Sequence, residues 1–431
     1  MEDISPARKS RPAVSAMAIS ALLIALTGMP PVDSNASGTA PQAAPSQPAH
    51  QHQSQPAKEA RSTELVSGPV ARFSDYPTPV IDPGGQLWLA FVEGDRVFVT
   101  RSSDGGKSFA RATPVIREPE SIDANGEGRP KIALGGATDV YVSWTKKKQK
   151  AYTGELRFSR STDSGRTFSP PISVADDEAG QRFDTLAVSP KGEIAVAWVD
   201  KRDLQRETAA GKPYSGAAVY FALSKDRGVT FTAARKIKDN TCECCRLALQ
   251  FDSSGRLVLA WRDIMPGSIR DHAIAIIEPD GSMKVQRVSF DQWKLDGCPH
   301  HGPSLSISQS GDIHLAWFTG QGPDGPGVYY SFVHDNQVSK ALRFGAVGVS
   351  GRPAVIAVSN QVYVAWKEEI GNGASAVNLA ISTDGGKSWS ASRPLAKTSK
   401  TADQPFLVSF RNKVFLSWFT RAEGYRLIAA N

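Results

Sequence analysis

All four cysteines of this 431-residue chain lie in two short clusters, one at residues 242–245 (Cys-Glu-Cys-Cys) and one at residues 298–301 (Cys-Pro-His-His). Thiolates and imidazoles gathered at one point form a site for a soft transition metal, and Cu(I) and Zn(II) are the leading candidates. A thioether nearby would add a further soft donor. The predicted metal ligands are Cys242, Cys244, Cys245, Cys298, His300, His301 and Met265.

Two other uses of the cysteines stay open at this point. An even number of cysteines in an exported protein suggests disulfides, and a redox-active pair is the third alternative. A bridge between the adjacent residues Cys244 and Cys245 would be strained, and a disulfide gives the His300-His301 pair no role. These arguments favour a metal. Copper comes ahead of zinc because the donors are soft and C-x-C-C is not a usual zinc spacing.

A short apolar strand that ends in an aromatic residue recurs along the chain and must position these clusters. The copies are about 54 residues apart on average, which suits one four-stranded propeller blade. No segment shows a sustained helical period, so the predicted class is all-β, a single β-propeller of seven blades, with six as the alternative. The terminal aromatics are Phe91, Trp144, Trp198, Trp261, Trp317, Trp366 and Trp418.

Four of the repeats also contain the motif S-x-D-x-G-x-x-F/W, which begins at Ser102, Ser161, Ser224 and Ser382. These copies resemble the Asp-box, or BNR, repeat of the sialidase-like β-propellers, and the resemblance covers the chain from about Glu64 onward. In that family the Asp box is a structural turn, so the resemblance implies a fold and not an activity. The combination with C-x-C-C and C-P-H-H resembles, more weakly, exported propellers linked to bacterial copper handling.

The sialidase resemblance implies an alternative function, that of an exo-sialidase-type glycoside hydrolase. Such enzymes hold the sialic-acid carboxylate with three arginines and use a Tyr activated by Glu as the nucleophile. Arg129, Arg246 and Arg352 occupy equivalent loop positions in alternate repeats and are candidates for the clamp. Tyr425 has only Glu423 nearby in the sequence, so no convincing Tyr–Glu pair is found. The balance is therefore against an enzyme; if the chain is one, exo-α-sialidase is expected.

The N-terminal region predicts export. Basic residues are followed by an apolar run at 13–26, which is typical of a signal segment, so residues 1–36 are expected to be a signal peptide or an uncleaved membrane anchor. The Pro-, Gln- and Ser-rich residues 37–63 predict a disordered linker, and residues 64–431 predict the propeller. We expect the stretch 65–72 to supply the outermost strand of the incomplete last blade. The expected location is the periplasm, with a tether to the inner membrane if the segment is not cleaved.

The net charge of the chain and its distribution indicate which kinds of partner to expect. The formal charge of +7 and the isoelectric point near 9.1 come without a basic run or arm, so no nucleic-acid partner is expected. Together these features predict a periplasmic metal-binding propeller that binds Cu(I) at its channel mouth and takes part in copper uptake or trafficking. Its expected partners are the metal ion and an outer-membrane metal-uptake receptor or another copper-handling protein. A disulfide-pinned, non-catalytic interaction propeller is the second alternative.

Overall fold

The computed structural model describes residues 75–431, and these belong to the second of the two units into which the chain divides at Thr63–Glu64. The expected signal or anchor segment, the linker and the strand expected at 65–72 lie outside the described residues, so those expectations and the expected export stay predictions. Among residues 75–431, no helix is long and apolar enough to cross a membrane.

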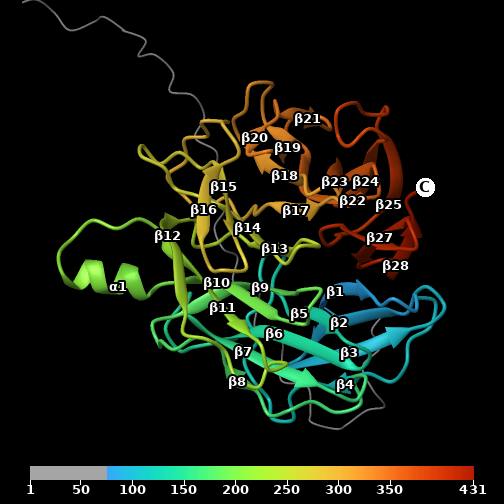
Figure 1. The fold of residues 1–431 in the computed structure, drawn as a ribbon. Helices are drawn as coiled ribbons and strands as arrows, with labels where there is room; N and C mark the ends of the chain where they lie inside the picture. The colour runs from blue at the N-terminus through green and yellow to red at the C-terminus, as the bar shows by residue number, and fades with distance from the viewer. Residues whose placement is uncertain (1–74) are drawn as a thin grey trace, which may run out of the picture. The chain divides into compact units, whose positions relative to one another are not determined.

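The described residues form a seven-bladed all-β propeller with one short helix (Figure 1). Blades one to three are four-stranded antiparallel sheets. Blade one contains β1 (Asp75–Ile81), β2 (Leu87–Glu93), β3 (Arg96–Ser102) and β4 (Thr113–Pro114). Blade two contains β5 (Lys131–Gly135), β6 (Asp139–Lys147), β7 (Gly154–Ser161) and β8 (Ile172–Ser173). Blade three contains β9 (Gln181–Val188), β10 (Ile194–Asp200), β11 (Ala217–Ser224) and β12 (Arg235–Thr241), with α1 (Arg202–Ala209) between β10 and β11.

The remaining blades follow the same order of strands. Blade four contains β13 (Ala248–Phe251), β14 (Leu257–Arg262), β15 (His272–Ile277) and β16 (Met283–Arg287). Blade five contains β17 (Ser304–Ile307), β18 (Ile313–Thr319) and β19 (Gly327–His334), and both β20 (Gln337–Val338) and β21 (Leu342–Phe344) pair with β19. Blade six contains β22 (Ser350–Val358), β23 (Gln361–Gly371), β24 (Ala374–Ser382) and β25 (Arg393–Thr398). Blade seven contains, among the described residues, β26 (Phe406–Phe410), β27 (Lys413–Thr420) and β28 (Gly424–Ala429).

The second strand of each blade is buried on both faces, which explains why the repeated segments are apolar throughout. In β10 every residue from Ile194 to Asp200 is buried. One face of such a strand packs on the preceding blade and the other on the following blade, so neither face alternates with polar residues. The hydrophobic clusters accordingly lie between blades, as where Phe158 of blade two meets Ile194 of blade three. The core is therefore a ring of interfaces that fixes each blade against the next.

The Asp-box turns join the third and fourth strands of blades one, two, three and six. In the first, Asp104 accepts hydrogen bonds from the backbone N–H groups of Lys107 and Ser108, and the Ser102 hydroxyl accepts one from Gly106 N–H. Gly106 has φ +84°, a conformation that glycine adopts without strain. The copies at Ser161, Ser224 and Ser382 make the same bonds.

The seven innermost strands follow one another around a channel, and β1 of the first blade packs against β26 of the last (Figure 1). Because the strands of a blade alternate in direction, the loops that lead into the innermost strands share one face of the propeller with the hairpins after the second strands. We call this the leading-loop face. The Asp-box turns after the third strands lie on the opposite face, the Asp-box face. The seven blades and these two faces confirm the fold that the repeats predict.

Candidate functional site

The two cysteine clusters lie in adjacent leading loops. Residues 242–245 connect β12 to β13, and residues 298–301 connect β16 to β17. Because β13 and β17 are neighbouring innermost strands, the loops meet at the channel mouth between blades four and five. Two groups of donor atoms result, each with all its atoms within 4.8 Å of one another. The first group is Cys242, Cys244 and Cys245, and the second is Cys244, Cys298 and His300.

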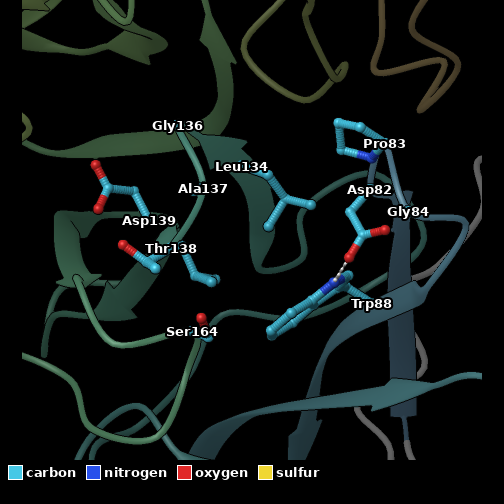
Figure 2. A pocket seen from close by; sticks show the side chains of 11 residues that line it. Asp82, Pro83, Gly84, Trp88, Leu134, Gly136, Ala137, Thr138, Asp139 and Ser164 are labelled. Carbon is cyan, nitrogen blue, oxygen red and sulfur yellow. Dashed lines mark hydrogen bonds between the residues drawn. The ribbon is translucent and has the colours of Figure 1, made fainter.

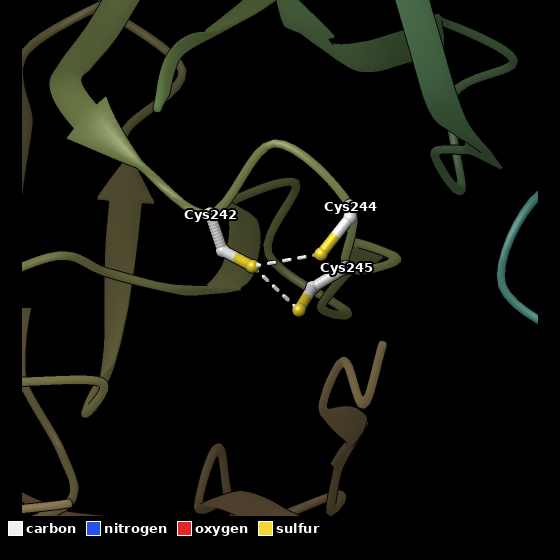
Figure 3. Close-up of side chains that lie close together, drawn as sticks. All are labelled: Cys242, Cys244 and Cys245. Carbon is white, nitrogen blue, oxygen red and sulfur yellow. Dashed lines mark hydrogen bonds between the residues drawn. The ribbon is translucent and has the colours of Figure 1, made fainter. Parts of the chain in front are cut away.

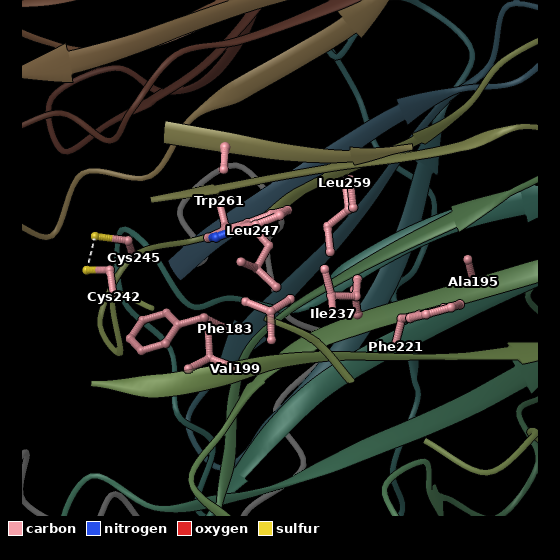
Figure 4. Packing of buried hydrophobic residues seen from close by; sticks show 14 of the residues in the cluster. Phe183, Ala195, Val199, Phe221, Ile237, Cys242, Cys245, Leu247, Leu259 and Trp261 are labelled. Atoms are coloured by element: carbon pink, nitrogen blue, oxygen red, sulfur yellow. Dashed lines mark hydrogen bonds between the residues drawn. The ribbon is translucent and has the colours of Figure 1, made fainter. Parts of the chain in front are cut away.

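Three of the four sulfur atoms are buried and close together. The Sγ atom of Cys242 lies 2.7 Å from that of Cys245 and 3.6 Å from that of Cys244 (Figure 3). No disulfide links the four cysteines, and Cys298 is the exposed member. The buried sulfurs lie at the edge of the apolar cluster between blades three and four, near Phe183 and Trp261 (Figure 4). Apolar side chains therefore cover one side of the three buried sulfurs, and the exposed Cys298 lies on the other side.

The surroundings favour one thiolate, that of Cys245, among the three buried sulfurs, and hydrogen bonding to Cys242 and Cys245 raises the pKa of the Cys244 thiol. Burial raises the pKa of the Cys242 thiol. For Cys245, burial is outweighed by hydrogen bonds from Cys242 and Cys244 and by the Arg262 guanidinium, which together lower its pKa well below the usual value. One sulfur of the Cys242–Cys245 pair thus carries charge while the other donates its proton. A hydrogen bond from Cys244 also lowers the pKa of Cys298. Such sulfurs are nucleophiles and soft ligands.

A buried carboxylate, that of Glu127, joins the two cysteine loops. Its Oε2 accepts hydrogen bonds from the backbone N–H of Arg246 (3.0 Å), which follows Cys245, and of Gly302 (2.7 Å), which follows His301. Its Oε1 accepts from the guanidinium groups of Arg246 (2.8 Å) and Arg352. Burial alone would raise the pKa of Glu127, but the two arginines outweigh it and lower the pKa to about 2. The ionised carboxylate of Glu127 therefore links loops of blades two, four, five and six, and we call this set of contacts the Glu127 clasp.

Two of the predicted ligands lie apart from the sulfur groups. His301 is half-buried with its ring 4.3 Å from that of Phe318, centroid to centroid, and its buried Nδ1 has no hydrogen-bond partner within the described part of the chain. Burial lowers its pKa, so the imidazole is neutral. Met265 lies in the β14–β15 hairpin, where its backbone pairs with that of Ile269. Among residues 75–431, no hydrogen bond joins its sulfur to the cysteines. The donor atoms that the structure brings together are thus those of the four cysteines and His300.

The three arginines of the sialidase interpretation do not meet around one open position. Arg129 is paired with Asp403 through two hydrogen bonds of 2.6 and 2.7 Å. Arg246 and Arg352 do converge, but on the carboxylate of Glu127. Their side chains differ in exposure, at 1% for Arg129, 12% for Arg246 and 29% for Arg352. Arg352 is therefore the member of this set that a ligand at the mouth can reach.

The tyrosine considered for the sialidase mechanism is not at the mouth. Tyr425 is a residue of β28, is 2% exposed, and its hydroxyl lies 2.8 Å from that of Ser417 in the interior. Its ring packs at 5.8 Å, edge to face, on that of Phe109 in an Asp-box turn. A buried phenol between blades one and seven cannot attack a sugar bound in the channel, so the structure forms no Tyr425–Glu423 nucleophile pair.

Lys131 and Asp184 were not predicted as site residues, although both belong to innermost strands. The Nζ of Lys131 donates a 3.0 Å hydrogen bond to the Arg129 carbonyl. Burial, reinforced by the charges of Arg129 and Arg246 and opposed by that of Asp184, lowers the pKa of Lys131 to about 8. Burial raises the pKa of Asp184, which accepts a 2.6 Å bond from Ser143. Lys131 and Asp184 could have been predicted from the sequence as polar residues within strands that line the channel.

A separate groove of about 240 Å³ lies on the Asp-box face between blades one and two (Figure 2). It is lined by the β1–β2 and β5–β6 turns, with Trp88 at its base held by a 3.0 Å hydrogen bond to Asp82. The acidic residue at its rim, Asp139, is already bound by Arg227 and by the Tyr141 hydroxyl. The groove therefore offers no reactive group, and the candidate site remains on the leading-loop face.

Comparisons with known proteins agree with the geometry of the repeats. The family model described as BNR/Asp-box repeat matches residues 380–391, the fourth of the Asp-box turns described above. The chain is a β-propeller with Asp-box repeats. No curated protein sequence matches this Asp-box propeller.

Several solved structures share the fold. A polysaccharide lyase of family PL25, an ulvan lyase bound to -[GlcA(1-4)Rha3S]-, is 9% identical, covers 84% of this chain and 95% of its own, and has a TM-score of 0.57. The polysaccharide lyase Uly1 is 10% identical over 87% of this chain and 92% of its own, with a TM-score of 0.51. The Hadza microbial sialidase Hz136 is 13% identical over 79% and 74%, with a TM-score of 0.48. At these identities the likeness shows the fold alone.

The comparisons correct the functional expectation from the sequence. The interpretation of the chain as a copper uptake or trafficking protein is wrong, because the solved propellers that share its fold at TM-scores of 0.57 and 0.51 are polysaccharide lyases. Since both lyases are enzymes, the expectation against an enzyme loses its basis, and exo-sialidase is not the only activity found on this fold. The cysteines suggested copper because soft donors identify a kind of ligand and not a biological role.

Proposed function

We propose that this Asp-box propeller is a carbohydrate-active protein that binds an acidic sugar at its channel mouth. The observation that carries the proposal is Arg352, whose side chain is 29% exposed while Glu127 and the His300 carbonyl hold its guanidinium in place. A guanidinium that is fixed and still reachable forms strong charge-assisted hydrogen bonds with a carboxylate. No reorganisation of the loop is needed when the sugar arrives, since the arginine is already oriented.

Other charges around Arg352 support an anionic ligand. Arg129, Lys131 and Arg246 act electrostatically on one another across the mouth. Glu127 and Asp403 neutralise part of this charge, but each already accepts hydrogen bonds from arginines. A carboxylate-bearing sugar would therefore enter a region where cationic side chains predominate. Electrostatic attraction of this kind raises the association rate of an anionic ligand.

The ulvan lyases support a uronate as the acidic sugar, since one of them is bound to a glycan that contains GlcA. Cleavage of a uronate by elimination needs a cation on its carboxylate and a base for the proton on the adjacent carbon. Arg352 would fill the first role. Lys131, whose pKa of about 8 leaves part of it neutral near physiological pH, would fill the second. The base takes the C5 proton, the C4–C5 double bond forms and the C4–O bond breaks. The protonated base then gives the proton to the leaving oxygen, so that the sugar is released with a hydroxyl group and the base is regenerated.

The test is a panel of substrates presented to the purified chain: uronate-containing polysaccharides, a neutral arabinan and a fluorogenic sialoside. Elimination produces an unsaturated sugar that absorbs in the ultraviolet, hydrolysis produces reducing ends without that absorbance, and an exo-sialidase releases sialic acid. We expect the uronate polymers to be cleaved with the ultraviolet signal. We expect Arg352→Ala to reduce kcat/KM about 100-fold, as loss of a group that stabilises developing charge does.

The matched control is Arg411→Ala. Arg411 is an exposed arginine in the β26–β27 turn on the Asp-box face, where it stacks on Phe410, so its removal should leave cleavage unchanged. If wild-type protein neither cleaves any member of the panel nor is retarded by uronate polymers in affinity electrophoresis, the proposal is wrong. Equal losses in both arginine variants would also contradict it, because the effect would then be one of general charge.

A further inference from the structure

We propose that the two cysteine loops hold one thiophilic metal ion, bound by Cys244, Cys298, His300 and one sulfur of the Cys242–Cys245 pair. The proposal is independent of the sugar site and assigns the chain no role in copper uptake or trafficking. Cys244 is central because it belongs to both groups of converging donor atoms, the buried group of three sulfurs and the group with Cys298 and His300. A single ion at Cys244 is therefore within reach of ligands from both loops.

Distances between the sulfur atoms indicate how the ion would be shared. Two thiolates that bind one tetrahedral ion at about 2.3 Å each lie about 3.7 Å apart. The Cys242 and Cys244 Sγ atoms, at 3.6 Å, match this separation. The Cys242 and Cys245 Sγ atoms, at 2.7 Å, are too close for both to bind the same ion. Cys242 is thus the fourth ligand that these distances favour, and Cys245 lies too close to it to bind the same ion.

The loops are held in this arrangement by groups that are not ligands. The Arg262 carbonyl accepts a 3.0 Å hydrogen bond from Cys242 N–H, while the Arg262 guanidinium donates to the His301 carbonyl at 3.0 and 2.9 Å. Glu127 fastens the residues that follow Cys245 and His301. The first loop is thereby held at both ends, by the Arg262 backbone and by Glu127, and the second loop is held at its C-terminal end by the Arg262 guanidinium and by Glu127. Cys244, Cys298 and His300 need little rearrangement to bind one ion, whereas the fourth sulfur must move closer to them, because no single group of atoms within 4.8 Å contains all four ligands.

The donor types select the class of ion. Thiolates and an imidazole suit Zn(II) and Cu(I), whereas Mg²⁺ and Ca²⁺ require oxygen ligands. Disulfides between the same cysteines are the competing explanation. Disulfides would not use the His300 imidazole, whose ring nitrogen lies within 4.8 Å of the Cys244 and Cys298 sulfurs, whereas a metal ion would. An ion at this point would fasten blade four to blade five beside the channel mouth.

The experiment is an anaerobic titration of the reduced full chain. Co(II) serves as a spectroscopic probe, because thiolate-to-metal charge-transfer bands report sulfur ligation, and Zn(II) and Cu(I) are then titrated in separate arms against a competing chelator. We expect one ion per chain. Cys244→Ser and Cys298→Ser should each weaken binding by more than ~10-fold, since even residues that only support a ligand cost that much. The two arms decide which ion binds more tightly.

His300→Ala keeps the test decisive if a cysteine variant fails to fold, because His300 is half-buried in a loop. Its matched control is His334→Ala, an exposed histidine that lies against Asp312 on the Asp-box face. We expect only the first to weaken binding and to shift the Co(II) spectrum. Thiol counting on protein purified without reductant completes the test. Bridged cysteines, together with a reduced chain that binds no ion better than Cys244→Ser does, would overturn the proposal.

Discussion

At the scale of single residues, Glu127 holds together the loops that form the channel mouth. It is 2% exposed and accepts hydrogen bonds from two guanidinium groups and two backbone N–H groups. The sequence predicted that the cysteine loops would meet, because they occupy equivalent positions in adjacent repeats. It could not predict the Glu127 clasp, since that contact joins residues more than a hundred positions apart around a closed ring. Nor could it predict that His301 packs on Phe318, because loop conformation decides where each of two neighbouring imidazoles lies.

We predict that Glu127→Gln lowers the free energy of unfolding by about 3 kcal/mol, because it leaves Arg246 and Arg352 without a counter-charge in a buried setting. Urea denaturation at neutral pH measures this. The control is Glu118→Gln, since Glu118 is exposed, and that change should leave the unfolding free energy within error of wild type. Equal stability of the two variants would mean that the clasp contributes nothing.

A pH dependence follows from the same residue. The folded-state pKa of Glu127, about 2, lies below its ordinary value of 4.5, so the unfolded chain binds the proton more readily. The stabilisation is fully present above pH 4.5 and is lost as pH falls from 4.5 toward 2. We predict that the stability difference between wild type and Glu127→Gln shrinks across this window. Denaturation at a series of pH values measures it, and a difference that stays constant down to pH 2 would contradict the assignment.

At the scale of elements, the strands and the Asp boxes were predictable and the helix was not. The core strands repeat an apolar pattern, and the Asp-box residues form bonds within five positions of each other, so local sequence determines both. Helix α1 has only two turns, and its N-cap residue, Lys201, forms no side-chain capping hydrogen bond. It is instead held by Asp203, which is buried and accepts a 2.6 Å hydrogen bond from the Tyr220 hydroxyl on β11. That contact is tertiary, so no periodicity revealed it.

We predict that Asp203→Ala loosens helix α1 without unfolding the propeller. Loss of the bonds to Tyr220, Arg206 and Lys236 should speed amide hydrogen exchange in residues 202–209 about tenfold, the equivalent of one strong side-chain hydrogen bond. Glu207→Ala is the control on the same helix, because Glu207 pairs only with Arg206 and Lys212 at the surface. Exchange that rises equally in both variants would argue against an anchoring role for Asp203.

At the scale of the whole molecule, the repeats determine the fold and leave the chemistry to the loops. At 9% identity to a lyase that covers 84% of the chain, hardly any residue outside the repeat pattern needs to be shared for the propeller to form. The fold was therefore readable from seven similar strands. The function was not, because the groups at the mouth come from the leading loops of several blades. The same separation explains why copper trafficking was inferred from a cysteine cluster although solved propellers that share the fold are polysaccharide lyases.

Ring closure provides the last prediction. Blade seven has three strands among the described residues, whereas the other blades have four or more, and β28 pairs only with β27 within residues 75–431. The sequence predicts that residues 65–72 add the missing outermost strand and so join the two ends of the propeller. We predict that a chain starting at Glu64 melts at the same temperature as the full chain, while one starting at Asp75 melts several degrees lower because an unpaired sheet edge is exposed. Calorimetry of the two truncated chains measures this, and identical melting temperatures would show that the closing strand is not needed.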